Sequence, residues 1–167
     1  MTAAEVIAAL ELRPLPREGG YYRETYRSAD VLPAGALPAR YDAARSAATA
    51  IYYLLTPDTF SALHRLPTDE VFHFYLGSPV QMLQLAPGGR GRVITLGTDL
   101  GAGQQPQVVV PRGVWQGSCL VSGGAFALLG TTMAPGFDFA DYEGGDRAAL
   151  SRQYPDFADL IERLIST

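Results

Sequence analysis

The chain has 167 residues, of which 47% are hydrophobic, and a formal net charge of -4 at pH 7. This length suits one domain, and the hydrophobic content excludes intrinsic disorder as the main state. The basic residues are all arginine, and no segment concentrates them enough to follow a phosphate backbone, so nucleic acid is not an expected partner. Arg23, Arg27 and Arg112 could still clamp a carboxylate or phosphate of a small ligand.

Nothing in the sequence indicates a membrane or an oxidising compartment. Cys119 is the only cysteine, so no internal disulfide can form. The N-terminal segment lacks the cationic start and continuous apolar stretch of a signal peptide, and no run approaches the ~20 apolar residues of a membrane helix. We therefore expect a cytoplasmic protein without a membrane partner.

The N-terminal part predicts a helix, a strand and a loop. Thr2 and Glu5 have the spacing of a capping box, and Pro14 and Pro16 stop the helix that follows. Aromatic and polar residues then alternate after Gly19-Gly20, as in a strand, before a stretch rich in proline and glycine. The predicted ranges are 3–11 for the helix, 21–27 for the strand and 29–44 for the loop.

Short apolar runs separated by glycine- and proline-rich turns fill the middle of the chain. A spacing of roughly 8–12 residues between such strands predicts a sandwich or barrel, here over about 19–134. Two helices should follow within about 146–166, the second beginning near Pro155, and the whole of 1–167 should form a single domain. The predicted strands are 47–55, 60–65, 69–76, 79–86, 91–97, 107–111, 114–121 and 124–133.

Two segments resemble the paired motifs of cupins. In HRLPTDEVFHFYLG, His64 takes the position of the first motif's leading His, Glu70 that of its Glu and Gly77 that of its closing Gly. Leu66 stands where this motif has a second His. In the second motif, the Pro-x-Gly turn is Pro111-Arg112-Gly113, and Gln116 stands where the motif has its His.

Four separated segments, EGGYY, ALHRLPTDEVFHFYLG, PQVVVPRGVWQG and APGFDFADYE, extend the resemblance from about Leu10 to Leu164. Together they resemble the small cupin-5 family of unknown function. The resemblance implies an all-β, cupin-type double-stranded β-helix, a jelly-roll barrel, with a short N-terminal helix and C-terminal helices. It also implies a homodimer, whereas it implies no particular reaction, because a fold does not fix chemistry.

Alternation along barrel strands places His64, Leu66, Glu70, Phe72 and Phe74 on the inner wall. His64 and Glu70 are the predicted catalytic pair, because a carboxylate can orient and charge-stabilise an imidazole that moves a proton. Trp115 either packs the barrel mouth or offers a flat platform to a sugar or base ring. The predicted substrate-binding residues are Tyr22, Glu24, Tyr26, Phe72, Gln107, Trp115 and Gln116.

A metal site is not favoured by this pattern. Metal-dependent cupins normally offer three imidazoles and a carboxylate, and two of the imidazole positions are Leu66 and Gln116 here. If a divalent metal is bound, its ligands would be His64, Glu70 and Gln116. His73 could join them only through a β-bulge, because on a regular strand it faces away from Glu70.

Three functional hypotheses follow, all with a small-molecule ligand. The first is metal-independent acid–base chemistry, such as epimerisation or isomerisation of a sugar-like or carboxylated substrate. The second is a non-catalytic ligand-binding or sensing module, which suits the loss of two metal-ligand positions. The third is a metal-dependent cupin enzyme. The sequence does not decide whether the protein is an enzyme.

Overall fold

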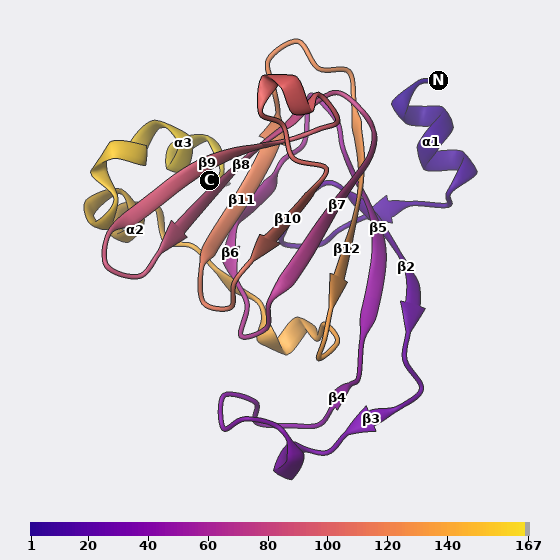
Figure 1. Cartoon of the computed structure of the whole chain (residues 1–167), viewed down its shortest axis with the longest axis vertical. Helices are drawn as coiled ribbons and strands as arrows, with labels where there is room; N and C mark the ends of the chain where they lie inside the picture. Colours follow the sequence, from indigo (N-terminus) through magenta and orange to yellow (C-terminus); the bar gives the residue numbers. More distant parts are fainter. Residues whose placement is uncertain (166–167) are drawn as a thin grey trace.

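Two antiparallel β-sheets face each other and enclose the main core in the computed structural model, which describes residues 1–165 (Figure 1). The helices are α1 (Ala3–Ala9), α2 (Arg147–Gln153) and α3 (Ala158–Arg163), with 3-10 turns η1 (Ala34–Ala36), η2 (Leu100–Ala102), η3 (Phe139–Asp141) and η4 (Pro155–Phe157). The strands are β1 (Arg13–Pro14), β2 (Tyr21–Arg27), β3 (Val31–Leu32), β4 (Arg45–Ser46), β5 (Thr49–Leu55), β6 (Ser61–Arg65), β7 (Glu70–Gly77), β8 (Val80–Ala86), β9 (Arg90–Leu96), β10 (Gln107–Val110), β11 (Trp115–Leu120), β12 (Ala127–Met133) and β13 (Glu143–Gly144).

The order of strands is that of a jelly roll. One sheet runs β1-β2-β5-β12-β7-β10 and the other β13-β6-β11-β8-β9. From β5 to β12 the chain crosses between the two sheets at every connection except the β8–β9 hairpin. The eight strands predicted from 47 to 133 are confirmed with small differences at their ends, and so is the all-β double-stranded β-helix.

The core between the sheets consists of apolar side chains from both layers. Tyr53, Phe72 and Leu129 enter from the first sheet, and Met82 and Leu96 enter from the second. All five are at most 1% exposed. Alternate positions on these strands therefore face one closed interior, as the periodicity of the sequence predicts.

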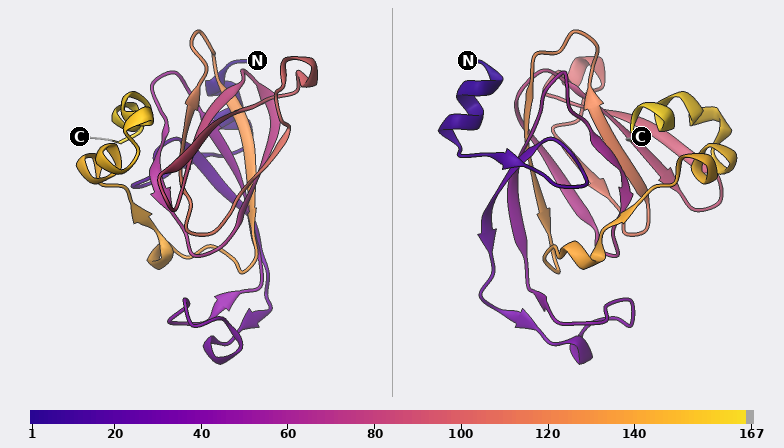
Figure 2. Two further views of the ribbon diagram at one scale, coloured as in Figure 1. Left: turned by 60° about the vertical axis from the view of Figure 1, so that its left-hand side comes forward. Right: turned by 180° about the vertical axis from the view of Figure 1, so that it is seen from behind.

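Helices cover the outer faces of the sheets at opposite sides (Figure 2). The predicted capping box of α1 is present, with Thr2 Oγ1 accepting from the Glu5 amide and Glu5 Oε2 accepting from the Thr2 amide. Val6 of α1 packs with Leu54 and Leu128 of the first sheet. Behind the second sheet, α2 and α3 form another apolar cluster, whose buried members are Leu63, Leu83, Leu85, Leu150, Tyr154, Ile161 and Leu164.

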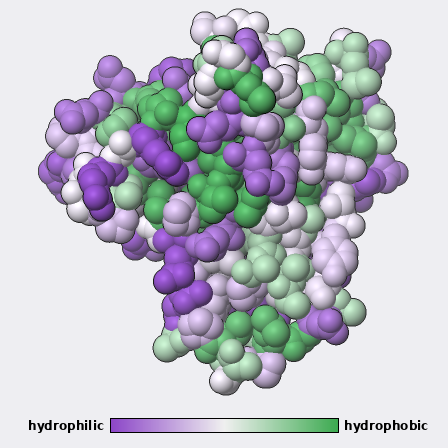
Figure 3. Space-filling view, in the orientation of Figure 1, coloured by the Kyte–Doolittle hydropathy of each residue, from purple (hydrophilic) through white to green (hydrophobic). Residues whose placement is uncertain are grey.

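The segment predicted as a loop over 29–44 is more regular than expected. Val31 and Leu32 pair with Arg45 and Ser46, so β3 and β4 form a two-stranded arm that extends below the two sheets (Figure 1). The tip of the arm shows apolar residues on the face seen in Figure 3. Val31 of β3 is 62% exposed. Short strands of this kind depend on pairing between distant residues, which local periodicity does not report.

The C-terminal helices also differ in detail from the prediction. Pro155 begins a 3-10 turn, η4, rather than the last helix, and α3 starts at Ala158. Tyr154, with φ -130° and ψ 65°, leaves the helical conformation and so separates α2 from η4. This break agrees with the tendency of a residue before proline to avoid helical backbone angles.

No helix within residues 1–165 combines the length and apolar character that crossing a membrane requires.

Candidate functional site

A cavity of about 400 Å³ lies on the inner side of the first sheet. Strands β2, β5, β7 and β12 supply its wall, and the segment after β12 closes one side of it. Apolar and acidic side chains alternate around it, so it offers both apolar contact and charge. The lining residues are Leu15, Glu18, Tyr22, Glu24, Arg27, Thr49, Ile51, Tyr53, Leu66, Glu70, Thr131, Met133, Phe137, Asp138 and Phe139.

A β-bulge determines which residues of β2 reach this cavity. Tyr22 and Glu24 line it as predicted, but the register between β2 and β5 shifts between Glu24 and Tyr26. Tyr26 is consequently 54% exposed and outside the cavity, and Arg27 lines it instead. The expectation that Tyr26 continues the alternation is therefore wrong, because one extra residue in a strand reverses the faces of the residues beyond it.

Glu18 enters the site from the turn before β2, and the sequence reasoning missed it. Gly19 follows with φ +96°, and a Cβ there would lie 2.5 Å from the carbonyl oxygen of Phe60, so only glycine fits. The Tyr53 hydroxyl donates to the Gly19 carbonyl at 2.9 Å, and the Ser61 hydroxyl donates to Glu18 Oε1 at 2.9 Å. The signal was the Glu-Gly-Gly sequence, whose two glycines indicate a constrained turn.

His64 is buried behind the carboxylates rather than in the cavity lining. Its Nδ1 lies 2.7 Å from the Ala62 carbonyl oxygen, so Nδ1 carries the proton and donates, and the lone pair of Nε2 points the other way. Nε2 lies 3.9 Å from Glu18 Oε2. The imidazole stacks on the Tyr142 ring with centroids 4.9 Å apart. The backbone and Tyr142 together fix its orientation.

Gln116 joins the two predicted catalytic residues. It pairs with His64 in the β6–β11 register, and its amide nitrogen lies 3.4 Å from His64 Nε2. The same nitrogen donates to Glu70 Oε2 at 2.5 Å. All three side chains are buried. The structure therefore brings His64, Glu70 and Gln116 together, and it adds Glu18 on the other side of the imidazole.

Burial changes the ionisation of these groups. Desolvation raises the pKa of Glu18 to about 7, against an opposing hydrogen bond from Ser61. Desolvation also raises the pKa of Glu70, and the negative charge of Glu18 raises it further. The pKa of the His64 imidazole is lowered by desolvation despite the nearby Glu70. Near neutral pH, the site thus holds a neutral imidazole and two carboxyl groups of which one readily keeps a proton.

The remaining predicted residues lie outside the cavity. Phe72 is buried in the core between the sheets. Trp115 packs with the apolar cluster of α2 and α3, and the Arg65 guanidinium lies 4.6 Å from its ring. His73 and Gln107 are paired on the outer face of the first sheet, where Gln107 Nε2 lies 3.3 Å from His73 Nδ1. Since Gln116 and Glu70 face inward, their neighbours at odd spacing face outward.

The donor set does not fit a tightly held transition metal. Among residues 1–165, no three His, Cys, Asp or Glu side chains are arranged to hold one. The amide NH₂ of Gln116 donates to Glu70 and occupies the position between imidazole and carboxylate, where a cation would need an oxygen or a lone pair. Leu66 adds only apolar surface, and His73 faces the opposite side of its strand.

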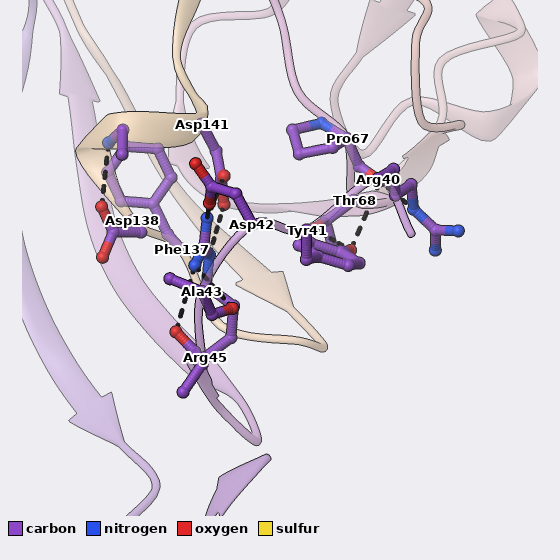
Figure 4. A network of polar contacts seen from close by, with 12 residues as sticks. Arg40, Tyr41, Asp42, Ala43, Arg45, Pro67, Thr68, Phe137, Asp138 and Asp141 are labelled. Atoms are coloured by element: carbon purple, nitrogen blue, oxygen red, sulfur yellow. Dashed lines mark hydrogen bonds and ion pairs between the residues drawn. The ribbon is translucent and has the colours of Figure 1, made fainter. Parts of the chain in front are cut away.

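A buried ion pair holds the mouth of the cavity in place (Figure 4). The Arg45 guanidinium at the base of the arm binds the Asp141 carboxylate, and both side chains are nearly buried, at 3% and 7% exposed. Arg45 also donates to the carbonyl oxygens of Ala43 and Ala44 at 3.0 Å each. This contact links the arm to η3, which begins with the lining residue Phe139.

Fold and cavity together define a cupin, and comparison with known proteins gives the family. Residues 4–144 match the family model Cupin_5, described as "Cupin superfamily (DUF985)". The chain belongs to this family. The uncharacterized protein YML079W of Saccharomyces cerevisiae is 32% identical to it in an alignment of 134 residues that covers 75% of this chain and 67% of that protein.

Solved structures support the same assignment. Protein SO0799 from Shewanella oneidensis superimposes with a TM-score of 0.86 at 34% identity, covering 99% of this chain and 98% of that one. A hypothetical protein from Leishmania major gives a TM-score of 0.89 at 31% identity, with both chains fully covered. Oxalate decarboxylase from Bacillus subtilis, a protein described as having Mn(II) centres, gives 0.54 at 13% identity over 93% of this chain and 37% of that one, and shows the fold alone.

Proposed function

We propose that this cupin binds a small sugar-like molecule and isomerises or epimerises it by metal-independent acid–base chemistry. The observation that supports the proposal is that two carboxyl groups with raised pKa values, the buried Glu70 and the largely buried Glu18, line one cavity. Paired carboxyl groups whose environments favour different protonation states are suited to act as acid and base in one reaction. His64, the catalytic candidate of the sequence, takes a positioning role behind them.

The proposed step transfers protons without any change in oxidation state. The ionised carboxylate of Glu18 takes the proton from a carbon next to the substrate carbonyl, and the electrons of the broken C–H bond form the enolate double bond. The protonated carboxyl of Glu70 gives its proton to the carbonyl oxygen, producing an enediol. A proton then returns to the other face of the same carbon or to the adjacent carbon, and the ionised Glu70 takes back a hydroxyl proton of the enediol, which restores the carbonyl and gives an epimer or an isomer.

The protein's own contacts adapt the two carboxyl groups to these roles. Ser61 donates to Glu18 and holds one of its oxygens, leaving the other free to receive a proton. Gln116 donates to Glu70 Oε2, so a proton on Glu70 resides on the other oxygen. The imidazole of His64 lies 3.9 Å from Glu18 Oε2 and is separated from Glu70 by the Gln116 amide. The charge of His64 opposes the raised pKa of Glu70, but desolvation is the larger effect and keeps that pKa high.

Deuterium exchange tests the chemistry even when the product is unknown. The protein is incubated in D₂O with a panel of aldoses, ketoses and amino sugars, and NMR follows loss of the proton next to the carbonyl. We expect exchange with at least one compound, and a loss of about 100-fold or more in Glu18→Gln and Glu70→Gln. Glu162→Gln, the same change on the surface of α3 where Glu162 pairs with Arg147, is the matched control.

The second candidate is a binding module without chemistry. It is favoured by the apolar lining, in which Leu66 takes a position where metal-dependent cupins have a ligand. Saturable binding of a panel compound without any exchange in the wild type would select this candidate over the first. The homodimer and the cytoplasmic location remain predictions, which sedimentation and cell fractionation test.

A further inference from the structure

The cavity is strongly unbalanced in charge. Four acidic side chains line it, Glu18, Glu24, Glu70 and Asp138, and Arg27 is the only base among its lining residues within the described chain. Binding sites for carboxylated or phosphorylated compounds normally present an excess of positive charge. This site presents the reverse, although the protein contains 13 arginines.

The one arginine is already committed to neighbouring groups. Arg27 Nε and Nη2 donate to the two carboxylate oxygens of Glu24 at 2.9 and 2.8 Å, and Nη2 also donates to the Phe137 carbonyl at 3.1 Å. Glu24 and Asp138 both raise the pKa of Arg27 through their charges. A bidentate pair of this kind leaves little attraction for a second anion, so Arg27 is a poor clamp for a ligand carboxylate.

The two inner carboxyl groups have no cation of their own among residues 1–165. Glu70 is 7% exposed and the Glu18 side chain 15%, and the nearest basic group of the site is the buried imidazole of His64, whose pKa is lowered. A buried carboxylate without a positive partner is unfavourable, and it either takes up a proton or binds a cation. An ammonium group in the cavity would supply the missing charge.

Aromatic side chains complete a site of this type. Tyr22, Tyr53, Phe137 and Phe139 line the same cavity, and Phe137 and Phe139 meet edge to face with ring centroids 5.0 Å apart. Aromatic faces attract cations and stack on the apolar face of a sugar ring. A cavity of about 400 Å³ lies at the small end of the range for small-molecule sites.

We propose that the cavity selects an amine-bearing, positively charged sugar-like compound and rejects the carboxylated counterpart of the same size. This inference rests on the proposed function only for the position of the site. It concerns binding and not turnover, because an ammonium group that keeps Glu70 ionised would remove the proton that the proposed step takes from Glu70. The ammonium group would lie against Glu18 and Glu70, with the carbon skeleton between the aromatic residues. Of the two substrate classes considered from the sequence, the carboxylated one is therefore not expected to bind.

Two series of ligands that differ only in charge test the selection. Titration calorimetry at pH 7.5 compares glucosamine, glucose and glucuronate, and then benzylamine, benzyl alcohol and benzoate. We expect each amine to bind at least 10-fold more tightly than its neutral analogue, and the acids to bind more weakly still. Glu70→Gln and Asp138→Asn should each reduce the preference for the amine several-fold, whereas Glu162→Gln should leave it unchanged.

Proton release gives an independent measurement of the same contact. A cation beside Glu18 and Glu70 favours their ionised forms, so binding of benzylamine, which is already fully protonated, should expel protons near neutral pH. The heat of binding should then differ between phosphate and Tris buffers at pH 7.0, because the two buffers take up protons with different enthalpies. Neutral analogues should show a much smaller difference.

Several outcomes would overturn the inference, and they can be told apart from a failure of the proposed function. Equal or tighter binding of the acids, or no binding of either amine up to about 50 mM, a concentration well above a millimolar dissociation constant, would refute the charge selection. Deuterium exchange could still be observed in that case with neutral sugars. Micromolar binding of Zn²⁺ or Mn²⁺ alone, lost in Glu70→Gln while amines fail to bind, would assign the negative charge to a metal instead.

Discussion

The side-chain nitrogen of Gln116 lies 2.5 Å from Glu70 Oε2 and 3.4 Å from His64 Nε2, so one uncharged amide separates the imidazole from the carboxylate. An amide donor at this point satisfies both acceptors with a single group. A metal ion at the same point would need lone pairs in place of the two N–H bonds. We therefore expect the identity of residue 116 to control whether this site can bind a metal ion.

Replacing that amide by an imidazole should create a metal site. In Gln116→His, a second imidazole joins His64, Glu70 and Glu18, which is a donor set that Zn²⁺ and Ni²⁺ bind well. We expect close to one equivalent of metal after dialysis, measured by elemental analysis, and far less in the wild type. Gln116→Leu removes the donor without adding a ligand and should stay metal-poor. One equivalent in the wild type would contradict the proposal of metal-independent chemistry.

Folding stability should depend on pH through Glu18. Because its pKa is raised to about 7 in the folded state, the folded protein binds more protons than the unfolded chain between about pH 4.5 and 7. The stability that protonated Glu18 provides is therefore lost as the pH rises through this range. His64, whose folded pKa is lowered, acts in the opposite direction at acidic pH. Glu18→Gln should remove the part of this loss between about pH 4.5 and 7 that comes from Glu18.

Urea unfolding at pH 5, 6, 7 and 8 measures this dependence. At each pH, the quantity to compare is the free energy of unfolding of Glu18→Gln minus that of the wild type. This difference should be more favourable to the variant at pH 8 than at pH 5 by on the order of 1–3 kcal/mol. Glu162→Gln should follow the wild type at every pH. Parallel curves for Glu18→Gln and wild type would show that this carboxyl group is not buried as described.

The turn that carries Glu18 should tolerate no side chain at residue 19. Gly19→Ala places a methyl group 2.5 Å from the Phe60 carbonyl oxygen in a left-handed backbone, so we expect a loss of about 2–4 kcal/mol in chemical denaturation. Gly123→Ala is the matched control, because Gly123 has φ +81° with nothing within 4 Å of its Cβ position. It should lose only about 1 kcal/mol. Equal losses would mean that strain, and not contact with Phe60, restricts the turn.

The ion pair that anchors the arm should contribute much more than a surface pair. Arg45→Met leaves the Asp141 carboxylate buried without a partner, and we expect a loss of about 3–5 kcal/mol. Arg65→Met breaks a pair with Glu143 whose side chains are 41% and 55% exposed, and should lose about 0–1 kcal/mol. Thermal or urea unfolding separates the two. The double variant Arg45→Met/Asp141→Leu should recover part of the loss, and failure to do so would argue against an isolated buried charge.

Much of the fold was predictable because it depends on local patterns. Alternation of apolar residues between turns located the strands from 47 to 133, and the Thr2–Glu5 spacing located the first helix. Periodicity also placed Glu70 and Gln116 inward and His73 outward. These features follow from the two-residue repeat of a strand and the backbone donors at a helix start, both of which a sequence displays directly.

The parts that were not predictable depend on tertiary contacts. Because of a single extra residue in β2, the side chain of Arg27 faces the cavity in place of that of Tyr26. No residue type in that strand indicates the bulge. Glu18 acquires its role from the Phe60 carbonyl and the Ser61 hydroxyl, which lie far away in the sequence. Asp138 and Phe139 reach the mouth through the pairing of Arg45 with Asp141. Each of these depends on partners brought together only by folding.

The cavity wall is divided between two kinds of structure. Glu18 and Glu70 are fixed by buried hydrogen bonds to the sheets, whereas Phe137, Asp138 and Phe139 belong to an irregular, more exposed segment after the last strand of the first sheet. Substitutions in an exposed segment disturb a core little. Substitutions at the mouth can therefore change which ligand the cavity accepts while the two reacting carboxyl groups stay in place.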